Sequence, residues 1–98
     1  NKMNQSSKNG KLVNWLESNN YLIKEFEFQK YLDGISFVDK IAIEAEKQKH
    51  HPDIEIFWCK VVIKLTSHDT GKITEKDVKL ASVIDKLFNQ GSKSGENK

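Results

Sequence analysis

The stretch KYLDGISFVDKIAIEAEKQKHHP, residues 30–52, decides the fold, because its hydrophobic side chains recur with the period of a helix. The repeating positions are Tyr31, Ile35, Val38, Ala42 and Ala45, and the stripe is widened by Phe37 and Ile41. This spacing predicts an amphipathic helix of about five turns. Ala42 and Ala45 are small enough to let the helix backbone approach whatever it packs on. Pro52 ends the pattern, because proline lacks an N–H and disfavours helical geometry at the residue before it.

Two strands are expected before this helix. Residues 12–17 include Val13 and Trp15, and residues 21–28 alternate between a mostly apolar and a mostly polar face. The apolar face of the second strand carries Leu22, Lys24, Phe26 and Phe28. The Asn19-Asn20 pair between the strands tolerates the positive φ of a tight turn, so the sequence predicts a β-hairpin.

Two more strands and a second helix are expected after residue 52. Residues 53–67 are rich in β-branched and aromatic side chains, with a tight reversal near residues 58–60. Thr74 followed by Asp77 is a variant of the capping box at helix starts. The apolar stripe that follows is formed by Leu80, Ala81, Ile84, Leu87 and Phe88, and Gly91 is expected to end the helix. The predicted fold is therefore α+β, in the order β-β-α-β-β-α, with two main helices on one face of a four-stranded antiparallel sheet.

Length and composition limit the classes of protein that remain. We expect one domain over residues 12–90, and flexible polar tails at 1–11 and 91–98, where no apolar periodicity occurs. The 16 basic and 14 acidic residues are interspersed, which argues against a nucleic-acid-binding surface. Cys59 is the single cysteine, no apolar run reaches the roughly 18 residues of a membrane span, and residues 1–11 lack the apolar part of a secretion signal. We therefore expect a cytoplasmic protein without a membrane or nucleic-acid partner.

Three histidines lie at the ends of predicted elements: His50 and His51 at the end of the first helix, and His68 after the fourth strand. These ends can converge, and histidine is suited to general acid–base chemistry because it gains and loses a proton near neutral pH. If the helix reaches His50, the Glu46 carboxylate lies on the same face and could orient its imidazole. Each histidine alone could equally be a surface residue, and Glu46 could form an ordinary solvated pair. Asp77 could serve only to stabilise a helix N-terminus.

The spacing of these residues resembles the signature of the pterin-4a-carbinolamine dehydratases. The matching positions, in order, are Glu46, His50-His51-Pro52, Trp58, His68 and Asp77. The resemblance continues through both predicted helices and the second strand, and it covers roughly residues 12–88.

The resemblance implies a dehydratase that removes water from 4a-hydroxytetrahydrobiopterin to give quinonoid dihydropterin, in tetrahydrobiopterin recycling, with no metal and no bound cofactor. It implies that His50 and His68 form the acid–base pair and that His51 orients the substrate. Glu46 and Asp77 would support these histidines, and the same pocket would be lined by Thr66, Ser67 and Asp69. Members of the family commonly join their sheets edge to edge, so a homodimer or homotetramer is expected.

Two other interpretations compete with this one. Three histidines and a carboxylate are common zinc ligands, although adjacent histidines cannot easily face one ion from a single regular element. Some animal members of the family are also non-enzymatic dimerisation partners of a transcription factor. The set of three histidines favours catalysis, because a binding role alone would place no demand on it.

Overall fold

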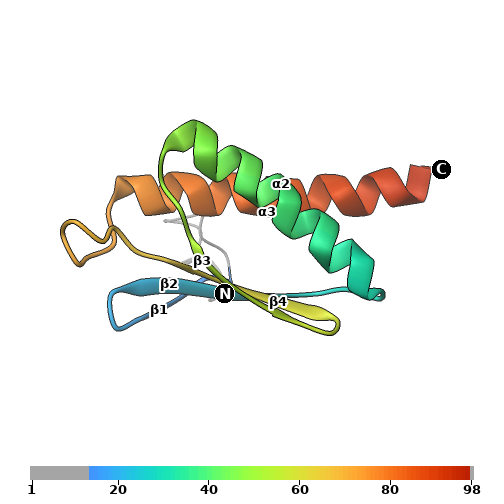
Figure 1. Ribbon diagram of the computed structural model, residues 1–98, viewed down its shortest axis with the longest axis horizontal. Coiled ribbons are helices and arrows are strands. Elements are labelled where there is room, and N and C mark those ends of the chain that lie inside the picture. The colour runs from blue at the N-terminus through green and yellow to red at the C-terminus, as the bar shows by residue number, and fades with distance from the viewer. Residues whose placement is uncertain (1–13, 98) are drawn as a thin grey trace, which may run out of the picture.

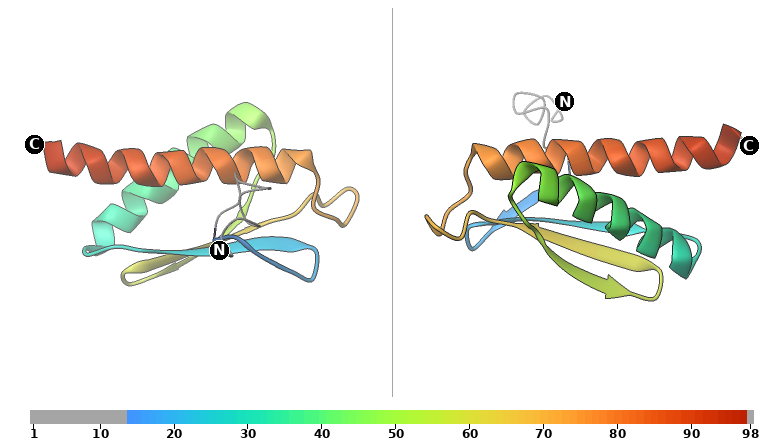
Figure 2. Two further views of the ribbon diagram at one scale, coloured as in Figure 1. Left: turned by 180° about the vertical axis from the view of Figure 1, so that it is seen from behind. Right: turned by 45° about the horizontal axis from the view of Figure 1, so that its top comes forward.

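The computed structural model describes residues 14–97, in which two helices cover one face of a four-stranded antiparallel sheet (Figures 1 and 2). The elements are β1 (Leu16–Ser18), β2 (Tyr21–Glu27), α2 (Tyr31–Gln48), β3 (Asp53–Phe57), β4 (Lys60–Leu65) and α3 (Glu75–Asn97). The predicted fold class and element order are confirmed. The expected tail at 1–11 and the start of the expected first strand, Leu12 and Val13, lie outside the described residues.

The strands lie in the order β1-β2-β4-β3, so β1 and β3 are the edges of the sheet. Asn19 and Asn20 take φ values of 52° and 67° between β1 and β2, which confirms the predicted hairpin turn. Asp53, at the start of β3, is paired with Lys64, near the end of β4. The chain entering β3 and the chain leaving β4 therefore meet at the same end of the sheet.

The core lies between the sheet and the helices. It includes Phe26 of β2, Phe37 of α2, and apolar residues of β4 and α3, namely Val61, Ile63, Leu65, Leu80, Ala81 and Ile84. Lys24 of β2 belongs to the same face, as expected, and its amino group reaches Asp85 of α3. The strand alternation read from the sequence thus places the correct face of β2 against the helices.

The buried stripe of α2 differs from the predicted one. Its buried residues are Gly34, Phe37, Ile41 and Ala45, whereas Tyr31 and Ala42 are exposed. The helix is rotated so that Phe37 and Ile41 face the core, because burial of large apolar side chains is the most favourable. Gly34, rather than Ala42, allows the close approach: a Cβ there would lie 3.3 Å from both the Phe28 ring and a Val61 methyl group.

The expectation that Gly91 ends the second helix is wrong, because α3 continues through it to Asn97. A glycine inside a helix costs about 1 kcal/mol relative to alanine, which weakens a helix without forbidding it. Neither helix in residues 14–97 combines the length and the apolar character needed to cross a membrane.

Candidate active site

The end of α2 determines where the two adjacent histidines point. The helix stops at Gln48, and Lys49 takes the left-handed conformation with φ 55° and ψ 40°. The N–H of Lys49 donates to the carbonyls of Ala45 and Glu46, and the N–H of His50 donates to the Ala45 carbonyl at 3.1 Å. His50 therefore lies outside α2, and its side chain does not project from the face of that helix.

As a consequence, Glu46 does not orient His50, and the expectation that depended on helix continuation is wrong. Glu46 instead contacts His51, with 2.7 Å between Oε2 and Nε2. The side chains of this pair are 78% and 59% exposed, respectively. Water and salt screen such a pair, so its contribution to stability is small.

The partner of His50 is Asp77, in the first turn of α3. Nε2 of His50 lies 2.5 Å from Oδ1 of Asp77. The His50 side chain is 11% exposed and the Asp77 side chain is fully buried. This contact joins the segment after α2 to the start of α3, and it places an imidazole beside a buried carboxylate.

The second oxygen of Asp77 is also fully engaged. Oδ2 accepts hydrogen bonds from the Thr74 backbone N–H and from the Ser67 hydroxyl, each at 2.9 Å. The Thr74 hydroxyl oxygen accepts the Lys76 N–H at 3.3 Å, which completes the predicted capping box. Asp77 thus has both functions that the sequence left as alternatives, since it caps α3 and holds His50.

The loop after β4 carries the remaining predicted site residues. The Ser67 N–H donates to the Lys72 carbonyl at 3.0 Å, and Gly71, with φ 70°, turns the chain between them. His68 and Asp69 lie exposed in this turn. Thr66 is buried, and its hydroxyl donates to the Asn20 carbonyl at 2.7 Å, away from Asp77.

The end of α2, the loop after β4 and the start of α3 lie side by side, at the left of Figure 1. The structure brings His50, Ser67 and Asp77 into one hydrogen-bonded cluster, with His51 and Glu46 as a separate pair at the same end of the molecule. Thr74, predicted only as part of a helix cap, also belongs to this cluster, because its hydroxyl lies 2.6 Å from that of Ser67. Within residues 14–97, no three histidine, cysteine or acidic side chains are grouped so as to hold one metal ion.

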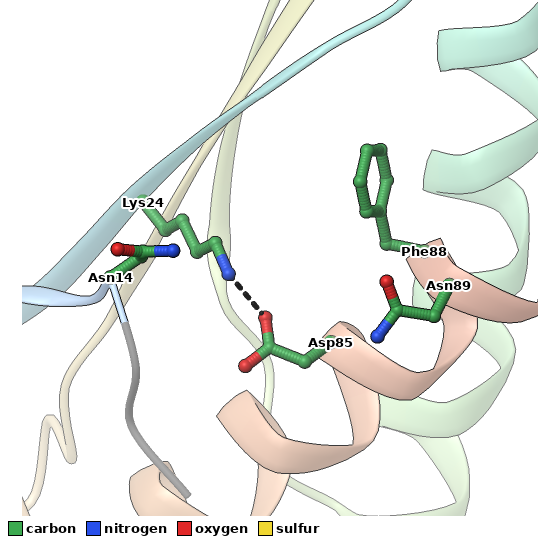
Figure 3. A pocket seen from close by; sticks show the side chains of 5 residues that line it. All are labelled: Asn14, Lys24, Asp85, Phe88 and Asn89. Carbon is green, nitrogen blue, oxygen red and sulfur yellow. Dashed lines mark hydrogen bonds and ion pairs between the residues drawn. The ribbon is translucent and has the colours of Figure 1, made fainter. Parts of the chain in front are cut away.

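A separate pocket of about 220 Å³ lies between β2 and α3, lined by Asn14, Lys24, Asp85, Phe88 and Asn89 (Figure 3). Lys24 Nζ lies 2.8 Å from Asp85 Oδ1. The other Asp85 oxygen accepts the Trp15 indole N–H at 3.0 Å. Because the two charges compensate each other and no histidine lines the pocket, we interpret it as a structural contact between sheet and helix.

The fold and the cluster define a small α+β protein in which a histidine imidazole lies beside a buried carboxylate. Residues 1–87 match the family model described as pterin 4 alpha carbinolamine dehydratase. The chain belongs to this family, as its signature residues indicated.

Relatives and solved structures agree with this assignment. A Prochlorococcus marinus (strain NATL2A) protein is 45% identical over 75 residues, which cover 76% of this chain and 79% of the relative. A Koribacter versatilis (strain Ellin345) protein is 37% identical over 78 residues, covering 80% and 83%. Both carry the provisional name pterin-4-alpha-carbinolamine dehydratase.

Two solved structures share the fold. One is described as a transcriptional coactivator/pterin dehydratase from Brucella melitensis, with a TM-score of 0.77, 25% identity, and coverage of 87% of this chain and 90% of that one. The other is a pterin dehydratase-like protein described as a RuBisCO assembly factor in the alpha-carboxysome. Its TM-score is 0.65 at 27% identity, over 76% of this chain and 88% of that one.

Proposed function

We propose that this protein is a 4a-hydroxytetrahydrobiopterin dehydratase that acts in tetrahydrobiopterin recycling. The observation that carries the proposal is the His50 imidazole held 2.5 Å from the fully buried Asp77 carboxylate. A buried carboxylate fixes the orientation of an imidazole, and general acid–base catalysis needs an imidazole held in this way. Family membership supplies the substrate class, a pterin carbinolamine.

The reaction needs two proton transfers and no external electron source. The C4a–O bond breaks as one histidine gives a proton to the departing hydroxyl, which leaves as water. The lone pair of the neighbouring ring nitrogen forms the new C=N bond, and the proton of that nitrogen passes to a second base. We assign the two transfers to His50 and His68, and the orientation of the ring to His51. These steps require neither a metal nor a bound cofactor.

The burial of the loop residues supports a division of the predicted substrate-binding set. The hydroxyls of Thr66 and Ser67 are already bonded within the protein, to Asn20 and Asp77. His68 and Asp69 are exposed on the same loop. We therefore propose that His68 and Asp69 meet the substrate, while Thr66 and Ser67 hold the loop and the cluster in place.

We further propose a homodimer or homotetramer in the cytoplasm. The edge strand β3 ends in exposed apolar side chains at Ile56 and Phe57, next to Trp58, which is 80% exposed. Apolar side chains on a sheet edge favour pairing with a second chain. The single cysteine, Cys59, fits a reducing compartment.

A coupled assay tests the proposed activity. An aromatic amino acid hydroxylase generates the carbinolamine, and its decay is followed with and without the purified protein. We expect a faster decay with the protein, and the double variant His50→Ala/His68→Ala provides the matched control. A decay rate that the folded protein leaves unchanged would refute the dehydratase, and would favour a binding role such as those in the descriptions of the two structural neighbours.

A further inference from the structure

We propose that the N-terminal cap of α3 fixes the tautomer of His50, with its proton on Nε2, and leaves Nδ1 as the nitrogen that exchanges protons with the substrate. Ser67 and Thr74 act as positioning residues in this arrangement. The catalytic part of this inference rests on the proposed function, whereas the tautomer is a property of the protein alone.

The direction of each hydrogen bond in the cluster follows from the chemistry of its members. An ionised carboxylate accepts hydrogen bonds and donates none, so the single hydroxyl proton of Ser67 points to Oδ2 of Asp77. The Ser67 oxygen must then act as the acceptor toward Thr74, 2.6 Å away. The Thr74 hydroxyl therefore donates to Ser67, and Ser67 donates to Asp77. The hydrogen-bond chain runs in one direction, toward the carboxylate.

The other carboxylate oxygen of Asp77 faces the imidazole of His50. Oδ1 of Asp77 is an acceptor, so His50 Nε2, at 2.5 Å, carries a hydrogen. A neutral imidazole has one N–H, and Nδ1 is consequently left with a free lone pair. Nε2 faces a fully buried side chain. Nδ1 is thus the atom through which His50 can take up a proton and later return it.

The two donors on Oδ2 hold the plane of the carboxylate. The Thr74 N–H is fixed by the backbone of the capping box, and the Ser67 hydroxyl is fixed by its own acceptor role toward Thr74. With Oδ2 anchored twice, Oδ1 is aimed at His50. Loss of the Ser67 hydroxyl removes one anchor and frees the carboxylate to rotate about its last side-chain bond.

The substitution Asp77→Asn gives a sharp prediction, because the asparagine amide has one accepting and one donating end. The Thr74 N–H can only donate, so the amide oxygen must take the place of Oδ2. The amide NH₂ then faces Nε2 of His50, which has to accept. The proton of the neutral imidazole must therefore move to Nδ1.

Nitrogen-15 NMR of the imidazole, recorded without substrate at a pH where His50 is neutral, measures the tautomer directly. We expect the Nε2–H form in the wild type and in Ser67→Thr, a mixture in Ser67→Ala, and the Nδ1–H form in Asp77→Asn. Glu46→Gln is the matched control, since Glu46 contacts His51 and should leave the His50 signals unchanged. A wild-type His50 with its proton on Nδ1 overturns the inference, even if no variant folds.

Kinetics separate the inference from the proposed function. Asp77→Asn should lower kcat by about 10²–10⁴-fold, the effect of disabling a positioned acid or base, with a smaller change in KM. Ser67→Ala should also lower kcat, whereas Ser67→Thr should keep kcat near the wild-type value. An inactive wild type with the Nε2–H tautomer would refute the dehydratase and retain the tautomer assignment. An active wild type with the Nδ1–H tautomer would support the dehydratase and refute the tautomer assignment.

Discussion

Asp77 lies 2.5 Å from His50 although the two residues are 27 positions apart in the chain. The contact depends on two local structures, the left-handed turn at Lys49 that releases His50 from α2 and the cap that fixes the first turn of α3. Both local structures are held by short-range interactions. The contact between His50 and Asp77 therefore forms once α2 and α3 are packed on the sheet.

His50→Ala and His68→Ala should each slow dehydration by about 10²–10⁴-fold, the usual effect of losing a general acid or base. Their effects on stability should differ. His68 is exposed, whereas removal of His50 leaves a buried carboxylate oxygen without its donor, at a cost of about 1–3 kcal/mol. The coupled assay and urea denaturation measure the two properties. Full activity in both folded variants would rule out the histidine mechanism.

His51→Ala should raise KM before it changes kcat, because His51 is proposed to orient the ring rather than to transfer a proton. Glu46→Gln should have a smaller effect than the loss of either acid–base histidine, since the exposed carboxylate acts through His51 alone. Steady-state kinetics over a range of substrate concentrations separate these outcomes. A fall in kcat at constant KM in His51→Ala would assign this residue to the chemical step instead.

Asp85→Ala should lower the free energy of unfolding by about 1–3 kcal/mol, because it leaves both Lys24 and the Trp15 indole without their acceptor. Both charged side chains are mostly shielded from solvent, at 18% for Lys24 and 21% for Asp85. Glu44→Ala, which removes a more exposed pair with Lys47, is the control and should cost less than about 0.5 kcal/mol. Equal losses in the two variants would contradict the role assigned to Asp85.

Activity should survive treatment with a chelator, because the proposed proton transfers need no metal. Assays before and after dialysis against the chelator, together with metal analysis of the purified protein, test this expectation. Loss of activity on chelation and its recovery with zinc would support the competing zinc interpretation.

The protein should be at least a dimer at micromolar concentration, and light scattering measures this directly. Of the two edge strands, β3 (Asp53–Phe57) is longer than β1 (Leu16–Ser18), so we expect pairing through β3. A lysine on an edge strand opposes such pairing. Ile56→Lys should therefore shift the protein toward monomer, whereas Leu16→Lys should not. A wild-type monomer, or dissociation by Leu16→Lys alone, would contradict the prediction.

The sequence predicted the fold well, because period-two and helical patterns depend on local sequence. The Asn19-Asn20 turn and the Thr74–Asp77 cap are likewise short-range features, and both are present. The extent of α3 was not predicted, because a glycine weakens a helix by an amount that its neighbours can offset.

The partner of His50 could not be predicted in the same way. The spacing of Glu46 and His50 was that of a helical pair, and only the left-handed Lys49 breaks it. Left-handed geometry at lysine leaves no clear signal in a sequence. The Ser67–Thr74 hydrogen bond joins two loop segments, and the sequence pattern gave no sign that their hydroxyls would meet.

The cap of α3 couples the orientation of His50 to the opening of a helix end. Helix ends open and close more often than helix centres, and such local opening precedes global unfolding. When the first turn of α3 opens, the Thr74 N–H releases Asp77, and His50 loses its orientation at the same moment. Amide hydrogen exchange at Thr74 should therefore report the fraction of molecules that are competent for catalysis. Heat should therefore inactivate the protein below its melting temperature, because the first turn of α3 opens before the whole chain unfolds. This turn controls activity without having to touch the substrate.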